Sequence, residues 1–406
     1  MPERTHQLLQ SSPEASPAPA QRVADSLAIA SRAEIRSIYL HVPFCFHKCH
    51  YCDFYSIVDS HDRQAAFTQR LIAELRHVSP RLRLPLVSIF IGGGTPTLLN
   101  VKHWHTLLAA MHDALQIDSQ ACEFTVEANP ETVTAELADT LAEGGINRIS
   151  IGCQSFNRDH LKTLERWHDP ENVSRAVSLF RNAGMKRISL DLIFGIPGQS
   201  LADWLLDLET ALALQPQHLS CYALTYELGT AMTEKLRLGR IERIDEDLEL
   251  AMYEAAIERL AHAGFEHYEI SNWAQPSEQC QHNLAYWTSR NWWAFGPSAS
   301  GHVDGVRWKN VPRLSEYLLH GPSPRVTDVE QLAANARIGE TLMMYLRLTD
   351  GIPEQSLAAL LADDLAGRTG VIEREVQAGR LIWRDGTLRL TDSGRRVADS
   401  VLAGLL

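Results

Sequence analysis

The sequence predicts an α/β protein whose parallel sheet is arranged as an incomplete TIM-type barrel. Short apolar runs typical of buried strands alternate with amphipathic helical segments, and such alternation produces a parallel sheet. Six of these strand–helix units follow one another between residues 37 and 243. Six units favour an incomplete barrel over a flat, doubly wound sheet, although the periodicity alone is compatible with both.

The six predicted strands are apolar runs, at residues 37–42, 86–94, 123–130, 146–155, 186–195 and 218–227. Helical segments separate them, and the clearest three are at residues 62–78, 101–116 and 132–143. In the first of these, Phe67, Leu71, Leu75 and Val78 recur at helical spacing along one face. Each helix is therefore expected to cover the outside of the sheet with its apolar side.

Beyond the barrel the pattern changes. An amphipathic helix is predicted over 244–265, and the Gly- and Trp-rich segment 292–310 predicts a close-packed loop and strand pair. Three helices, a hairpin and a last helix follow, at residues 331–347, 353–363, 369–378, 381–391 and 392–405. Asp385-Gly386 is a strong turn signal for the hairpin. Helices followed by a hairpin predict a winged-helix-like α+β domain, which we interpret as a lid or interaction domain.

The predicted organisation has four parts: a disordered tail at 1–33, the barrel at 34–243, an extension at 244–325 and the winged-helix-like domain at 326–406. A length of 406 residues allows two to three domains. The formal net charge of −12 argues against a general nucleic-acid-binding protein, which needs a basic surface. No apolar run reaches the ~18 residues of a membrane span. Seven cysteines and no apolar leader predict a cytoplasmic protein.

Three cysteines lie close together on the predicted loop after the first strand. Cys45, Cys49 and Cys52 have the spacing C-x3-C-x2-C. Thiolates are soft ligands that suit iron–sulfur clusters and zinc. A [4Fe–4S] cluster has four irons, so three thiolates leave one iron free to bind a small molecule. The spacing therefore predicts a reaction centre.

A structural zinc site is the alternative for this loop. His41, His47 or His50 would then supply the fourth ligand. Structural zinc usually takes two pairs of ligands from separate segments, and the sequence has no second cysteine pair. The spacing favours the cluster without excluding zinc.

Polar and glycine residues follow every predicted strand. The carboxyl ends of barrel strands form one rim, where the chemistry of such folds takes place. The Gly92-Gly93-Gly94-Thr95 segment lets the backbone approach a ligand, or else forms a tight turn. Glu127 at the end of a buried strand needs partners, which a ligand, a helix cap or an ion pair would supply.

The cysteine motif followed by Asp53-Phe54 resembles the radical S-adenosylmethionine (SAM) superfamily. Within it, the segment is similar to the group that holds the oxygen-independent coproporphyrinogen III oxidases and related haem chaperones. The resemblance favours the partial (β/α)6 barrel. It implies that the open iron chelates SAM, and that an electron from a donor such as flavodoxin or ferredoxin splits SAM into methionine and a 5′-deoxyadenosyl radical.

The resemblance also implies which residues contact SAM. They are Tyr39, Tyr51, Gly93, Gly94, Thr95, Glu127, Gln154, Arg166, Asp191 and Ala223. The match is closest around Asp191, where DLIFGIPGQ (191–199) copies the family pattern. It departs before Arg166, because Glu165 stands where the family usually has glycine.

The motif His282-Asn283-x-x-Tyr286-Trp287 distinguishes the members of the group. From the residues alone, His282 is a core histidine with two packing aromatics. The resemblance implies instead that His282 belongs to a haem-binding segment, as in the haem chaperones. Cys280 is either a second thiolate ligand or a buried thiol.

Two functions compete. A haem chaperone binds haem and passes it to acceptor haemoproteins, whereas the oxidase decarboxylates two propionate groups of coproporphyrinogen III. Phe54 stands where the oxidases have a fourth cysteine, only a low-complexity segment precedes Ile35, and HNxxYW is typical of the chaperones. We therefore expect a haem chaperone that cleaves SAM without oxidising coproporphyrinogen. A radical SAM methyltransferase is a distant third. Relatives include homodimers and peripheral membrane proteins, although the sequence displays neither property.

Overall fold

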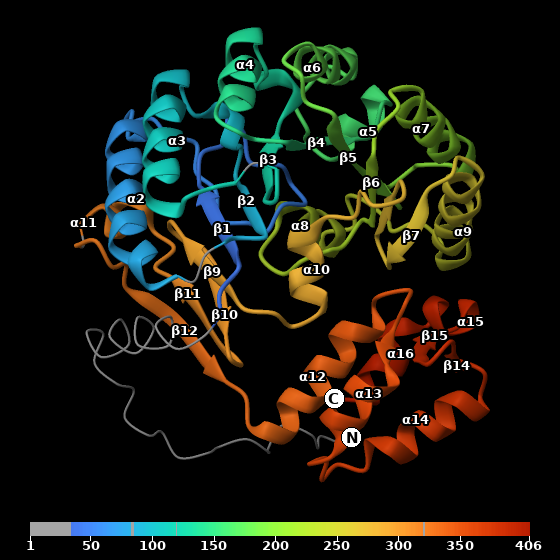
Figure 1. Ribbon diagram of the computed structural model, residues 1–406. Helices are drawn as coiled ribbons and strands as arrows, with labels where there is room; N and C mark the ends of the chain where they lie inside the picture. Colours follow the sequence, from blue (N-terminus) through green and yellow to red (C-terminus); the bar gives the residue numbers. More distant parts are fainter. Residues whose placement is uncertain (1–33, 83–84, 119, 320) are drawn as a thin grey trace.

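The computed structural model describes residues 34–82, 85–118, 120–319 and 321–406. A curved sheet wrapped by helices forms the larger part of the molecule, and a smaller helical body lies beside it (Figure 1). The six central strands are β1 (Ser37–Val42), β2 (Ser88–Gly93), β3 (Glu123–Ala128), β4 (Arg148–Gln154), β5 (Arg187–Phe194) and β6 (His218–Ala223). They pair in sequence order and all in parallel. The predicted partial (β/α)6 barrel is confirmed.

Helices cover the outer face of these strands (Figure 1). They are α2 (Gln64–Val78), α3 (Val101–Leu115), α4 (Ala135–Glu143), α5 (Arg158–Thr163), α6 (Glu171–Asn182) and α7 (Leu201–Ala213). Phe67, Leu71, Leu75 and Val78 of α2 are all buried in the main core, as their spacing predicts. The same core contains the thiols of Cys122, Cys153 and Cys221.

The register of the sheet brings four residues to one level of the barrel interior. Tyr39 pairs with Phe90, Phe90 with Thr125, and Thr125 with Arg148. Successive side chains on a strand point to opposite faces, so these four share a face. An arginine thus lies inside the barrel on the same layer as two aromatic rings.

Strands from the second half of the chain widen the sheet at both edges. On one side β9 (Trp292–Phe295) pairs in parallel with β1, followed by the antiparallel strands β10 (Ser300–Val303), β11 (Val306–Asn310) and β12 (Val326–Gln331). On the other side β8 (Asn272–Ala274) pairs with β6, and β7 (Glu266–Glu269) with β8. The segment 292–310 therefore forms three strands, one more than the predicted pair, and these strands extend the barrel wall.

Further helices connect these strands: α8 (Ala231–Arg237), α9 (Glu246–His262), α10 (Gln281–Trp287) and α11 (Leu314–Leu319). The short helix α10 carries the HNxxYW motif and packs on β2. Among the helices of the described residues, none is both long enough and apolar enough to cross a bilayer.

The smaller body has its own apolar core, which includes Ile338, Leu342 and Leu388. It is formed by α12 (Ala334–Leu346), β13 (Ile352–Pro353), α13 (Glu354–Leu361), α14 (Arg368–Gln377), β14 (Leu381–Arg384) and β15 (Thr387–Leu390), with two final helices. Asp385 and Gly386 both have positive φ, as the predicted hairpin turn requires.

The prediction of one last helix at 392–405 is wrong. The segment forms α15 (Asp392–Arg396) and α16 (Ala398–Ala403), which are separated at Val397 with φ −126° and ψ 31°. Thr391 caps the first helix by accepting a hydrogen bond from Gly394 N at 3.0 Å. The break changes the direction of the chain, so that Val401 and Leu402 enter the smaller core.

Candidate cluster and cofactor site

The cysteine loop leaves the end of β1 and is tied back to it by backbone hydrogen bonds. Cys45 N donates to Ile57 O at 2.9 Å, and Ile57 N donates to Pro43 O at 2.8 Å. Inside the loop, Cys52 N donates to Cys49 O at 3.2 Å. Cys49 is buried, whereas the other two thiols are partly exposed. The three thiols are thus held on one closed loop at the rim of the barrel.

Two side chains from other segments of the chain reach the thiols. Arg166 Nη1 donates to Cys49 Sγ at 3.7 Å and Arg166 Nη2 to Gly152 O at 3.0 Å. Thr95 Oγ1 lies 3.6 Å from Cys45 Sγ. Glu165 has φ +52°, so it takes the left-handed conformation for which the family pattern uses glycine. The backbone geometry before Arg166 is therefore kept despite the substitution.

The electrostatics of the loop suit a metal cluster. Burial raises the pKa of Cys45, and burial together with neighbouring thiols raises the pKa of Cys52 to about 11. Thiolates so close together repel one another, and bound metal cations are what keeps such thiols deprotonated. The donor set therefore fits an iron–sulfur cluster.

The zinc alternative finds less support in the geometry. His41 is bonded at both ring nitrogens, with Nε2 2.8 Å from Tyr55 O and Nδ1 3.1 Å from Tyr39 OH. The His47 ring stacks on Trp167 at 4.1 Å. In the described part of the chain, no three His, Cys, Asp or Glu side chains converge on one metal-ion position. A cluster distributes its thiolates over separate irons, so it does not need such convergence.

The glycine segment beside the cysteine loop has no room for side chains. Gly93 has φ +110°, and a Cβ there would overlap the His41 ring. A Cβ on Gly92 would lie 2.7 Å from Glu127 Oε2, and one on Gly94 would lie 2.6 Å from Phe44 O. Gly93 N donates to Glu127 Oε2 at 3.1 Å. The backbone and the Glu127 carboxylate are thus fixed against each other.

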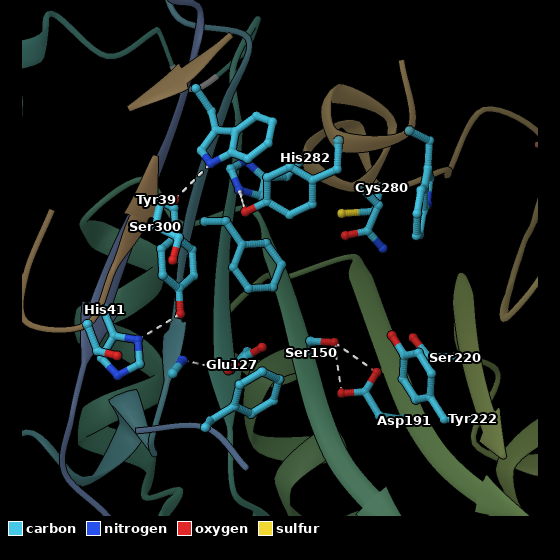
Figure 2. Close-up of a pocket in the computed structure, with 18 of the residues that line it drawn as sticks. Tyr39, His41, Glu127, Ser150, Asp191, Ser220, Tyr222, Cys280, His282 and Ser300 are labelled. Atoms are coloured by element: carbon cyan, nitrogen blue, oxygen red, sulfur yellow. Dashed lines mark hydrogen bonds between the residues drawn. The ribbon is translucent and has the colours of Figure 1, made fainter. Parts of the chain in front are cut away.

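Two carboxylates face the interior next to this segment (Figure 2). Ser150 Oγ donates to Asp191 at 3.1 and 3.2 Å from its two oxygens. Burial, followed by repulsion from Asp191, raises the pKa of Glu127 from 4.5 to about 7. Burial also raises the pKa of Asp191. Both groups would be stabilised as carboxylates by a cationic ligand.

A cavity of about 570 Å³ runs from these carboxylates to helix α10. Of the residues singled out from the sequence, it is lined by Tyr39, His41, Asp53, Phe54, Gly93, Glu127, Asp191, Cys280, His282, Asn283, Tyr286 and Trp287. The other candidates lie around the cysteine loop and the outer rim, outside this lining: Cys45, Cys49, Cys52, Tyr51, Gly94, Thr95, Gln154, Arg166 and Ala223. The structure thus divides the candidates between a cluster region and a neighbouring cavity.

His282 is bonded at both ring nitrogens. Nδ1 lies 3.0 Å from Ser88 Oγ and Nε2 lies 2.8 Å from Tyr286 OH, while the ring stacks on Phe90 with centroids 5.2 Å apart. Burial, then the charge of Arg148, lowers the pKa of His282 to about 3. The imidazole is therefore neutral, which is the form that binds metals, but Nε2 must leave Tyr286 before it can do so.

Cys280 is fully buried beside this histidine. Its thiol donates to Glu123 Oε1 at 3.4 Å, and burial raises its pKa to about 12. The thiol is thus protonated at neutral pH. Of the tryptophans nearby, Trp287 and Trp292 line the cavity, whereas Trp293 and Trp308 are core residues.

Several cavity residues were not identified from the sequence, chiefly Arg148, Ser150, His218, Ser220, Arg307 and Lys309. Arg148, Ser150, His218 and Ser220 alternate with apolar residues inside β4 and β6. A charged or polar residue at every second position of an otherwise apolar strand is the signal that marks a polar barrel interior.

The comparisons with known proteins agree with this geometry. Residues 39–211 match the model of the radical SAM superfamily, and residues 332–397 match the HemN C-terminal domain. The solved structure of coproporphyrinogen III oxidase (HemN) from Escherichia coli superposes with a TM-score of 0.80, covering 94% of this chain and 93% of that one, at 20% identity. That likeness establishes the fold. Barrel, cysteine loop and matched model together define a radical SAM protein.

Sequence relatives show to which family within the radical SAM superfamily the chain belongs. The heme chaperone HemW of Mycobacterium tuberculosis (strain H37Rv) is 36% identical over 383 residues, which cover 91% of this chain and 94% of that protein. HemW of Bacillus subtilis is 32% identical, with 92% and 99% covered. HemW of Escherichia coli is 39% identical over 269 residues, with 66% and 70% covered. The chain therefore belongs to the HemW family within the radical SAM superfamily.

Proposed function

We propose that this protein is a cytoplasmic haem chaperone, which binds haem and transfers it to acceptor haemoproteins. The observation that carries the proposal is one cavity of about 570 Å³ that joins the Glu127 and Asp191 carboxylates to the HNxxYW helix. It supports a ligand-binding role for the barrel interior in a chain whose HemW relatives are named heme chaperones.

The rim would hold a [4Fe–4S] cluster through Cys45, Cys49 and Cys52. With SAM bound, this site would supply radical chemistry, for which a donor such as flavodoxin or ferredoxin would provide the electron. The Arg166 guanidinium donates a hydrogen bond to Cys49 Sγ and so orients this sulfur at the rim. The residues that would contact SAM are Tyr39, Tyr51, Gly93, Gly94, Thr95, Glu127, Gln154, Arg166, Asp191 and Ala223.

The α10 end of the cavity would hold the haem. Phe90, Tyr286 and Trp292 offer ring faces and edges to a flat macrocycle, and Trp292 packs 4.4 Å from Tyr286 between ring centroids. His282 would supply Nε2 to the iron after releasing Tyr286 OH. Ser88 already bonds Nδ1, which fixes the orientation of the ring for this role.

A haem titration of the full chain tests this assignment. We expect His282→Ala to weaken haem binding by at least roughly tenfold, the equivalent of one strong bond. His160→Ala is the matched control, since His160 is also buried but lies on the outer helix α5. Equal binding by the wild type and His282→Ala would contradict the assignment of His282.

The alternative function is oxygen-independent coproporphyrinogen III oxidase activity, because the chain shares its fold with HemN from Escherichia coli. The distinguishing residue is Phe54, which lines the cavity mouth where the oxidases carry a fourth cysteine. Anaerobic reconstitution of the cluster, followed by incubation with coproporphyrinogen III, SAM and a reductant, separates the two functions. We expect SAM cleavage and no protoporphyrinogen; rapid formation of protoporphyrinogen would overturn the chaperone proposal.

A further inference from the structure

The guanidinium of Arg148 lies inside the barrel without a partner in the part of the chain that the structure describes. Its side chain is 2% exposed and lines the cavity between Tyr39 and helix α10. Throughout the described residues, no carboxylate oxygen lies within 4.0 Å of its guanidinium, and the guanidinium makes no hydrogen bond. The carboxylates of Glu123 and Asp191 act on it only over longer distances.

The acids around Arg148 are already bound elsewhere. Glu123 accepts a hydrogen bond from Arg187 at 2.9 Å and another from the Cys280 thiol. Asp191 accepts hydrogen bonds from Ser150. Their fields keep Arg148 charged, but they leave its five N–H donors free.

A buried cation without hydrogen bonds is costly, and this cost is removed when an anion binds to it. The planar fork of a guanidinium matches a carboxylate, which it binds through two parallel hydrogen bonds. Because Arg148 lies on the same level as Phe90, the anion would sit at the edge of an aromatic surface. The ligand that fits is therefore a flat aromatic molecule with a carboxylate arm.

We propose that Arg148 is the carboxylate anchor of the cavity and binds one propionate group of haem. The inference rests on the proposed function and adds to it the orientation of the haem, with a propionate toward β4 and the ring against α10. The anchor lies close enough to His282 for its charge to act on the imidazole.

The same cavity contains a second cation that serves as a comparison. Lys309 lies on β11, and β3, β2, β1, β9 and β10 separate it from β4 in the sheet. Its side chain is partly exposed, so water already satisfies it. Arg307 next to it is tied to Glu330 at 2.7 Å and to Glu340 at 2.5 Å. Neither cation is both buried and without a hydrogen-bond partner among the described residues, as Arg148 is.

The test is to titrate the cluster-loaded full chain with ferric protoporphyrin IX and with its dimethyl ester, which lacks the carboxylates. We expect the wild type to bind the acid roughly 10- to 100-fold more tightly than the ester, the range of a charged hydrogen bond. Arg148→Gln should lose this preference by weakening acid binding alone. Arg148→Lys should keep part of the preference for the acid, and Lys309→Gln should keep nearly all of it.

Each outcome is decisive. If Arg148→Gln binds the acid as the wild type does, or weakens acid and ester equally, the anchor is not Arg148. The same holds if Lys309→Gln alone abolishes the preference. A wild type that binds acid and ester equally would overturn only this inference, whereas a wild type that binds neither would overturn the proposed function as well. Ester binding also reports that each variant retains a folded cavity.

Discussion

The two ends of the barrel cavity differ in the sign of their charge and in how their polar groups are satisfied. At the rim, the Glu127 and Asp191 carboxylates accept hydrogen bonds from Gly93 N and Ser150 Oγ. At the end closed by α10, the buried Arg148 guanidinium has no hydrogen-bond or ion-pair partner among the described residues, whereas His282 has a partner on each ring nitrogen. The carboxylates of the rim are thus held in place by hydrogen bonds before a ligand binds. The guanidinium at the inner end is not held in this way by the described residues.

This difference predicts separate places for the two ligands of the proposed function. SAM is a sulfonium with an amino group, so it is attracted to the carboxylates at the rim. A haem carries carboxylate arms, so it is attracted to Arg148 and repelled by Glu127 and Asp191. Under the proposed function, the opposite charges at the two ends of the cavity would direct SAM and haem to different places.

The largest effect is expected from removing a cluster ligand. Cys49→Ser should abolish the cluster, with loss of the visible and EPR signals and SAM cleavage at background, because a hydroxyl is a poor iron ligand. Haem binding at the α10 end should stay at the wild-type level. Cys122→Ala is the control, since this thiol lies in the core beside β3 and away from the loop. SAM cleavage surviving in Cys49→Ser would disprove the cluster assignment.

Next in size is the glycine segment. Gly93→Ala should lower the free energy of unfolding by more than the about 1–2 kcal/mol of a left-handed alanine, because its Cβ also overlaps His41. It should also weaken SAM binding by roughly tenfold or more, since Gly93 N holds Glu127. Gly198→Ala shares the positive φ, +84°, but meets no atom within 4 Å. Urea unfolding and SAM titration of both variants separate backbone strain from loss of the SAM site. If Gly198→Ala loses as much stability and SAM affinity as Gly93→Ala, the close packing around Gly93 is not what matters.

The pH dependence of SAM binding is a smaller effect. The pKa of Glu127 is raised to about 7, so the folded, ligand-free protein holds a proton that the unfolded chain releases near 4.5. Its stabilising contribution, roughly 3 kcal/mol, is complete below pH 4.5 and lost as the pH rises through 7. A cationic ligand needs the carboxylate, so SAM affinity should fall about tenfold from pH 8 to pH 6. Equilibrium dialysis should show that SAM affinity depends much less on pH in Glu127→Gln. An unchanged pH dependence would mean that another group takes up the proton.

The smallest effect concerns the α10 end. Tyr286→Phe removes the hydroxyl from His282 Nε2, which should cost about 1 kcal/mol of stability and tighten haem binding several-fold, because the nitrogen no longer has to break a bond. Tyr253→Phe is the control, as its hydroxyl bonds Ile270 O at 3.1 Å away from the cavity. Weaker haem binding in Tyr286→Phe would mean that the hydroxyl itself holds the ligand.

The sequence was sufficient for the barrel and for most of the rim. Each motif there directly follows an apolar run, so Gly93, Glu127 and Asp191 could be located without knowing which strands pair. The hairpin turn at Asp385-Gly386 was equally local. The break at Val397 was not, because it depends on how the end of the chain packs on the smaller core.

The inner end of the cavity could not be predicted in the same way. Arg148 reaches it only through a register that runs across four strands, from Tyr39 by way of Phe90 and Thr125. His282 enters through α10, a helix from another part of the chain that packs on β2. Such positions depend on pairing between distant segments, whereas the rim depends on strand ends alone.

The pairing of β1 with β9 has a consequence for the biogenesis of the protein. Ribosomes deliver β1 and its thiol loop early, but the outer edge of β1 lacks its neighbour until Trp292–Phe295 has emerged. The hydrogen bond from Leu314 N to Tyr55 OH, which braces the same loop, forms later still. During synthesis the thiols therefore stand beside an open sheet edge for a time, and under the proposed function the cluster would be accessible for assembly before the wall is complete.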